Sequence, residues 1–130
     1  MRNHERNAKA LVILGSLILF VSAPLHGFGG FRGVFSVLGG KNIPPHVMGA
    51  LKVVWLMVSW HWVAIGAIAL VVSFGRTAPR RAVVLLCGLV TLLDAVGGLV
   101  AVGPFIGDEL LSVAAVAILA GAVLFPSAES

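Results

Sequence analysis

The chain has 130 residues, of which 59% are apolar and only 11% are charged, and its mean hydropathy is +1.08. Soluble domains are about half apolar and about a quarter charged, so this composition excludes an ordinary soluble domain, and its many Leu, Val, Ala and Ile residues exclude a disordered chain. The net charge of +4 does not indicate a nucleic-acid partner, because the nine Lys and Arg residues lie at helix ends rather than in a cluster. We therefore predict a single all-α membrane domain over residues 1–130, an integral membrane four-transmembrane-helix bundle whose partner is the lipid bilayer.

The first two predicted spans cover about residues 8–26 and about residues 46–75. A basic start and a short apolar run also describe a signal peptide, and a small-residue tripeptide before Pro24 has the form of a cleavage site. Signal peptidase disfavours proline directly after the cut, so we expect the segment to be retained as a membrane helix. The second span begins after Pro44 and Pro45, which set a helix boundary.

The segment between these spans is rich in glycine and aromatic residues. Its apolar side chains fall at helical spacing, with Arg32 on another face; they are Phe31, Val34, Phe35 and Leu38. This pattern predicts a short interfacial amphipathic segment between helices 1 and 2. Such a segment would lie over the outer mouth of the bundle, either as a lipid-facing cap or as a lid over a pocket.

The last two predicted spans, about residues 80–102 and 108–125, are separated by a short turn. Asp108 and Glu109 begin the fourth span, where acidic side chains suit the positive end of the helix dipole. Small residues permit close helix contact, either inside the bundle or in a homodimer; they are Gly97-Gly98 on the third span and Ala117-x-x-x-Gly121 on the fourth.

The distribution of Lys and Arg predicts the orientation of the spans. Six of these residues lie in the N-terminal tail or between the second and third spans: Arg2, Arg6, Lys9, Arg76, Arg80 and Arg81. Three lie on the opposite side: Arg32, Lys41 and Lys52. By the positive-inside rule we expect a multi-pass protein of the cell (inner) membrane with both termini in the cytoplasm.

Asp94 lies deep in the third span, where an acid costs several kcal/mol unless it is paired, protonated or facing water. It shares one helix stripe with Cys87, Thr91 and Gly98, and this polar stripe is expected to face the bundle interior. His61 in the second span is its natural partner, because counting residues from the connecting turn places both at nearly the same depth. We predict a His61–Asp94 hydrogen bond, which either fixes the helix register or acts as a proton relay, metal ligand or ligand anchor.

Trp60 and Trp62 flank His61, and they either wall a flat apolar ligand such as a quinone or porphyrin or pack against helices and lipid. His26 closes the first span on the outer side, nearer the surface than His61, which makes shared axial ligation of a haem awkward. No tight spacing such as HxxxH predicts a metal site, and no nucleophile–base pair is evident. The candidates for ligand binding or a proton relay are therefore His61, Asp94, Trp60, Trp62, His26 and Thr91.

Several short motifs follow one another along the chain. His26-Gly27 ends the first span, a Phe- and Gly-rich stretch follows, and Ile43-Pro44-Pro45 precedes a long second helix and two further spans. This order resembles the DoxX-like group of small four-helix membrane proteins over about residues 10–125. That group usually carries an acid in the second helix, where this chain has Ser59-Trp60-His61-Trp62. The resemblance implies a redox association, since members have been linked to quinone-coupled sulfur oxidation and to membrane redox complexes, often as accessory subunits.

Three functions are open from the sequence. The first is a redox-associated or accessory subunit that binds a quinone, haem or lipid-like ligand near the outer mouth of the bundle. The second is a structural or assembly protein that docks on a larger membrane complex, for which the small residues of the fourth span would matter more than His61. The third is a minimal proton-coupled transporter that acts as a dimer and uses Asp94 as its acid.

Overall fold

The computed structural model describes residues 2–75, 79–104 and 106–126, and every regular element in these residues is helical. In chain order the elements are α1 (Arg2–Pro24), the π-helical segment η1 (Leu25–Gly30), α2 (Phe31–Gly39), α3 (Pro45–Phe74), α4 (Arg80–Val102) and α5 (Ile106–Leu124). Within the described residues, four helices are long and apolar enough to cross a membrane. The predicted all-α architecture with four long apolar helices is therefore confirmed.

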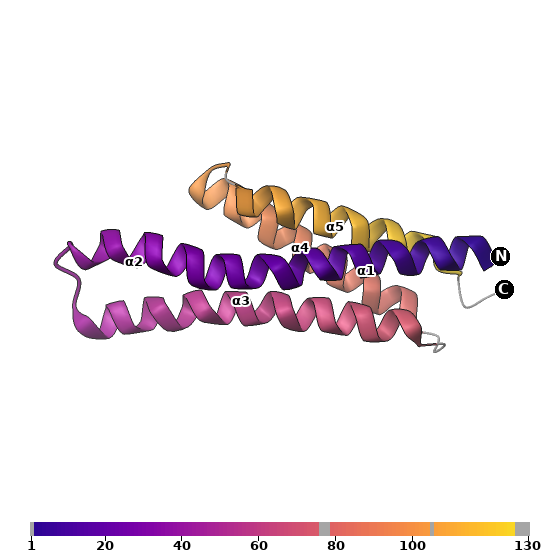
Figure 1. Cartoon of the computed structure of the whole chain (residues 1–130), viewed down its shortest axis with the longest axis horizontal. Coiled ribbons are helices and arrows are strands. Elements are labelled where there is room, and N and C mark those ends of the chain that lie inside the picture. The colour runs from indigo at the N-terminus through magenta and orange to yellow at the C-terminus, as the bar shows by residue number, and fades with distance from the viewer. Residues whose placement is uncertain (1, 76–78, 105, 127–130) are drawn as a thin grey trace.

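The first of these four helices is longer than the predicted span. It runs for 37 residues, Asn3–Gly39, because η1 and α2 continue the line of α1 (Figure 1). At about 1.5 Å per residue its length is about 55 Å, well above the roughly 30 Å of a bilayer's hydrocarbon core. The residues of the predicted interfacial segment form the helix α2, and its place at a membrane interface stays a prediction.

A few side-chain contacts connect α2 with the first half of α3. The Phe35 ring lies 4.8 Å from Phe31 and meets Trp55 of α3 edge-on, with centroids 6.0 Å apart. The Lys52 ammonium lies 6.0 Å from the Phe31 ring and 5.9 Å from the Phe35 ring, which is the range of a cation–π contact. The hairpin of α2 and α3 consequently extends past the turn between α4 and α5 (Figure 1).

Small residues bring α1 and α5 into close contact. A Cβ on Gly121 would lie 2.8 Å from the Ala8 carbonyl oxygen, and one on Gly15 would lie 2.8 Å from the Ala114 carbonyl oxygen. Fully buried apolar side chains surround this contact; they are Val12, Leu19, Ile118 and Ala122. In this structure the Gly121 face of the fourth span therefore serves the packing of the bundle itself.

At the end of the bundle that carries the N-terminus, Arg80 connects several helices. It donates hydrogen bonds of 3.1 Å to Glu5 and 3.0 Å to the Gly75 carbonyl oxygen. Its guanidinium also lies 4.2 Å from the centroid of the Phe125 ring. The first residue of α4 thus joins the start of α1 to the ends of α3 and α5, which closes this end of the bundle.

Candidate functional site

One carboxylate oxygen of Asp94 joins α4 to α3. The indole nitrogen of Trp62 donates a hydrogen bond of 3.0 Å to Asp94 Oδ2, and His61 Nε2 lies 3.3 Å from the same oxygen. His61 and Asp94 are therefore close, as residue counting predicts, but their contact is at an ion-pair distance and does not have the geometry of the predicted hydrogen bond. The hydrogen bond from Trp62 is an additional contact that the count does not predict.

The polar groups around Asp94 differ in exposure. The side chain of His61 is 46% exposed and that of Asp94 is 29% exposed, whereas Trp62 is only 5% exposed. The stripe that we expected to face the interior does so at Cys87 and Thr91, which are buried, and only in part at Asp94. The Trp62 indole and His61 are therefore the polar groups in contact with the Asp94 carboxylate.

His26 lies on the other side of Trp62. The His26 ring stacks on Trp55, with centroids 4.2 Å apart and planes inclined by 9°, and meets Trp62 edge-on at 4.8 Å. The Trp55 indole also donates a hydrogen bond of 2.9 Å to the His26 carbonyl oxygen. A continuous line of contacts therefore runs from Asp94 through Trp62 and His26 to Trp55, and it joins α4, α3 and η1.

The π-helical segment η1 sets the position of His26. Its i→i+5 hydrogen bonds make a wider turn than an α-helix, and such turns occur frequently at functional sites. Gly30, the last residue of η1, faces the indole of Trp55 so closely that a Cβ at this position would overlap the ring. A residue without a side chain is thus needed here for Trp55 to stack on His26.

A cavity of about 340 Å³ adjoins His26, between η1, α3 and the first turns of α5. Its lining is mostly apolar and includes Ser22, His26, Trp55, Trp62, Ile106 and Leu110. Two polar atoms of these residues, His26 Nε2 and Ser22 Oγ, are buried and have no hydrogen-bond partner in the described part of the chain. Buried polar atoms normally have partners, and an apolar pocket with a few polar groups is the usual form of a small-molecule site.

Four of the six predicted site residues do not line this cavity: His61 and Asp94, which contact each other beyond Trp62, and also Trp60 and Thr91. Trp60 is 71% exposed and lines a smaller pocket of about 210 Å³ together with Phe28 and Ser59. Thr91 is fully buried, and its hydroxyl donates a hydrogen bond of 2.9 Å to the Cys87 carbonyl oxygen one turn earlier in α4. Apart from Trp60 and Thr91, the predicted residues form one continuous group of contacts.

The sequence reasoning did not include Trp55 and Ser22 among the site residues. A signal was available for both, because helical residues that lie one or two turns apart share a face. Trp55 precedes Trp62 by seven residues, and Ser22 precedes His26 by four. Each therefore lies on the same face as a residue that was predicted.

No group of three or more His, Cys, Asp and Glu side chains is placed to hold a metal ion in the part of the chain that the structure describes. A comparison with protein-family models, with curated proteins and with solved structures finds no match. The function of the site is therefore inferred from the contacts, the cavity and the unpaired polar atoms described above.

Proposed function

We propose that the chain is a redox-associated integral membrane subunit that binds the head group of a quinone in the cavity beside His26. One observation carries this proposal. An apolar cavity of about 340 Å³ is lined by two side chains whose buried polar atoms, His26 Nε2 and Ser22 Oγ, have no partner among the described residues. A ligand that brings hydrogen-bond acceptors into the cavity would satisfy them after a small rotation of the two side chains.

A quinone head group complements the cavity in shape and in chemistry. It is flat, its carbonyl oxygens accept hydrogen bonds, and its apolar tail lies in lipid. The Ser22 hydroxyl is a donor, and a neutral imidazole at His26 donates from one of its nitrogens. The indoles of Trp55 and Trp62 supply planar apolar walls, and the volume lies within the range of small-molecule pockets.

A haem fits this arrangement less well. Axial ligation by two histidines would require His26 and His61 to reach one iron from opposite faces. His61 Nε2 instead lies 3.3 Å from Asp94, and Trp62 contacts both Asp94 and His26. The quinone is therefore the ligand class that the contacts favour.

Quinone binding can be measured on the detergent-purified protein by quenching of tryptophan fluorescence, because Trp55 and Trp62 line the cavity. Decylubiquinone should quench this fluorescence and raise the unfolding temperature. His26→Phe keeps a ring that can stack on Trp55 but removes the nitrogens, so it should weaken binding about tenfold. His46→Ala, at an exposed position of α3, is the matched control and should bind like the wild type. Wild-type protein that decylubiquinone neither quenches nor stabilises would contradict the proposal.

We place the four long helices across the cell (inner) membrane, with both termini in the cytoplasm. The support is the Lys and Arg distribution and the exposure of large apolar side chains such as Leu93 and Val116 on the outside of the bundle. In a Cys87→Ser background, an impermeant maleimide should label Lys41→Cys in intact cells and should leave Asn3→Cys unlabelled. Labelling of Asn3→Cys alone would contradict this orientation.

The resemblance to the DoxX-like group points in the same functional direction, since that group has been linked to quinone-coupled oxidation. The His26-Gly27 pair that carries part of the resemblance lies in η1, and His26 lines the cavity. As an accessory redox subunit the chain would act together with a larger membrane complex. Co-purification of a redox enzyme with the tagged protein is the expected outcome of that role.

A further inference from the structure

Asp108 is a buried acid that the quinone site does not use. It is only 5% exposed, and its Oδ2 atom has no hydrogen-bond partner in the described residues. Its carboxylate lies directly over Gly98 of α4, where a Cβ would overlap Oδ1. Because an unpaired buried carboxylate is costly, a counter-charge or a proton at this place would stabilise the fold.

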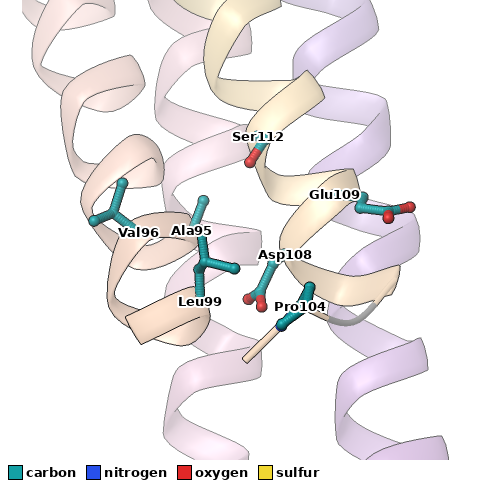
Figure 2. Close-up of a pocket in the computed structure, with 7 residues that line it drawn as sticks. All are labelled: Ala95, Val96, Leu99, Pro104, Asp108, Glu109 and Ser112. Atoms are coloured by element: carbon teal, nitrogen blue, oxygen red, sulfur yellow. The ribbon is translucent and has the colours of Figure 1, made fainter. Parts of the chain in front are cut away.

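The Asp108 carboxylate lines an opening of about 370 Å³ between the end of α4 and the start of α5 (Figure 2). The apolar part of the wall is formed by Ala95, Val96, Leu99 and Pro104. Figure 2 shows that the Ser112 side chain is directed into the space between the two helices, whereas Glu109 points away from Asp108. This opening is distinct from the quinone cavity, because the first turns of α5 contribute different residues to each.

The charge around the opening is negative although the whole chain carries +4. Its lining contains two acids, Asp108 and Glu109, and none of the described basic side chains. The positive end of the α5 dipole interacts favourably with a negative charge on Asp108. Apolar walls weaken screening, so a cation that enters the opening is attracted more strongly than it would be in water.

The donors and acceptors favour an organic ammonium ion over a metal ion. A metal site needs several ligands, and no cluster of three or more such side chains occurs in the described part of the chain. A primary ammonium has three N–H donors, which a carboxylate and a hydroxyl can accept. The geometry points to the binding of an amphipathic primary amine in this opening. Its ammonium lies on Asp108 and Ser112, and its apolar body lies against Val96 and Leu99.

The test compares two probes of nearly equal shape by isothermal titration calorimetry of the detergent-purified full chain. 2-Phenylethylamine carries the ammonium, whereas 2-phenylethanol replaces it with a neutral hydroxyl. We expect the amine to bind about tenfold or more tightly than the alcohol. Asp108→Asn should weaken amine binding about tenfold, and the matched control Glu109→Gln should weaken it less than about threefold, because Glu109 points away from Asp108.

Equal affinity for the amine and the alcohol would overturn the inference, and so would unchanged amine binding in Asp108→Asn. If Asp108→Asn does not fold, two other measurements still test the inference. The first is the comparison of the two probes on the wild type. The second is Ser112→Ala, which should weaken the binding of the amine and not that of the alcohol. Decylubiquinone binding should be unchanged in Asp108→Asn. Wild-type protein that binds the amine but does not respond to decylubiquinone would contradict the proposed function and leave the amine site standing.

Discussion

The indole nitrogen of Trp62 donates a hydrogen bond of 3.0 Å to Asp94, from the buried face of α3 to α4. This bond fixes the orientation of an indole that also meets the His26 ring at 4.8 Å. The acid is partly exposed, whereas the indole is buried in the wall of the cavity. One rigid side chain therefore connects the polar pair at the α3–α4 interface with the proposed quinone site.

The Trp62 bond can be removed while an aromatic ring is kept. Trp62→Phe should lower the free energy of unfolding by about 1–2 kcal/mol, because the Asp94 carboxylate loses a donor. The control is Trp60→Phe, since Trp60 is 71% exposed, and it should change the stability by less than about 0.5 kcal/mol. Thermal unfolding in detergent measures both variants, and equal losses in the two would contradict the role assigned to the bond.

Two substitutions at Asp94 separate its charge from its function as an acceptor. Asp94→Asn keeps an oxygen that the Trp62 indole can reach, so decylubiquinone affinity should stay within about twofold of the wild type. Asp94→Ala removes the acceptor and frees the indole, so the affinity should fall about threefold to tenfold. Fluorescence quenching reports both values. If Asp94→Asn is as impaired as Asp94→Ala, the charge rather than the indole position controls the cavity.

Gly30 is required for the stacking of Trp55 on His26. A Cβ at Gly30 would overlap the Trp55 ring, so Gly30→Ala should displace the indole and weaken decylubiquinone binding about tenfold. Gly29→Ala is a matched control in the same π-helical segment, because a Cβ at that position meets nothing within 4 Å. Tryptophan emission should shift in Gly30→Ala only, and similar spectra for the two variants would show that Trp55 does not depend on this glycine.

Neighbouring glycines of α4 should respond in opposite directions. Gly98→Ala forces a methyl group against the Asp108 carboxylate and should destabilise the protein by about 1–3 kcal/mol. Gly97→Ala meets nothing within 4 Å and should stabilise the helix by up to about 1 kcal/mol, since alanine is the better helix former. The two unfolding temperatures, measured side by side, show whether each substitution stabilises or destabilises the protein. A stabilised Gly98→Ala would show that Asp108 does not lie over α4.

The helices and the closeness of His61 to Asp94 were predictable because both rest on regular geometry. Long apolar runs bounded by proline or charge define the helices, and a short turn forces α3 and α4 to be antiparallel neighbours. Once two helices are antiparallel neighbours, the rise per residue fixes which positions share a depth. The matching depth of His61 and Asp94 therefore does not depend on the rest of the bundle.

The remainder of the site depends on how each helix is rotated about its axis, and helical spacing alone does not say which face meets a cavity. Six glycines between residues 26 and 46 suggest a break, yet the helix continues to Gly39. Trp60 and Trp62 lie two positions apart and so point to different sides, which places only Trp62 in the cavity. Trp55 joins the site through its stacking on His26, which lies in η1.

The π-helical turn of η1 has the effect of one extra residue inserted into an otherwise continuous helix. An additional residue advances the rotation by about 100°, so the face of α1 that packs on α5 does not continue into α2. Before this segment α1 packs on both α5 and α3, and after it Phe31 and Phe35 approach Lys52 of α3. Deleting Gly29 would restore the ordinary period and rotate both phenylalanines away from α3. The outer hairpin would then separate from its partner helix while the contacts of α1 stayed intact.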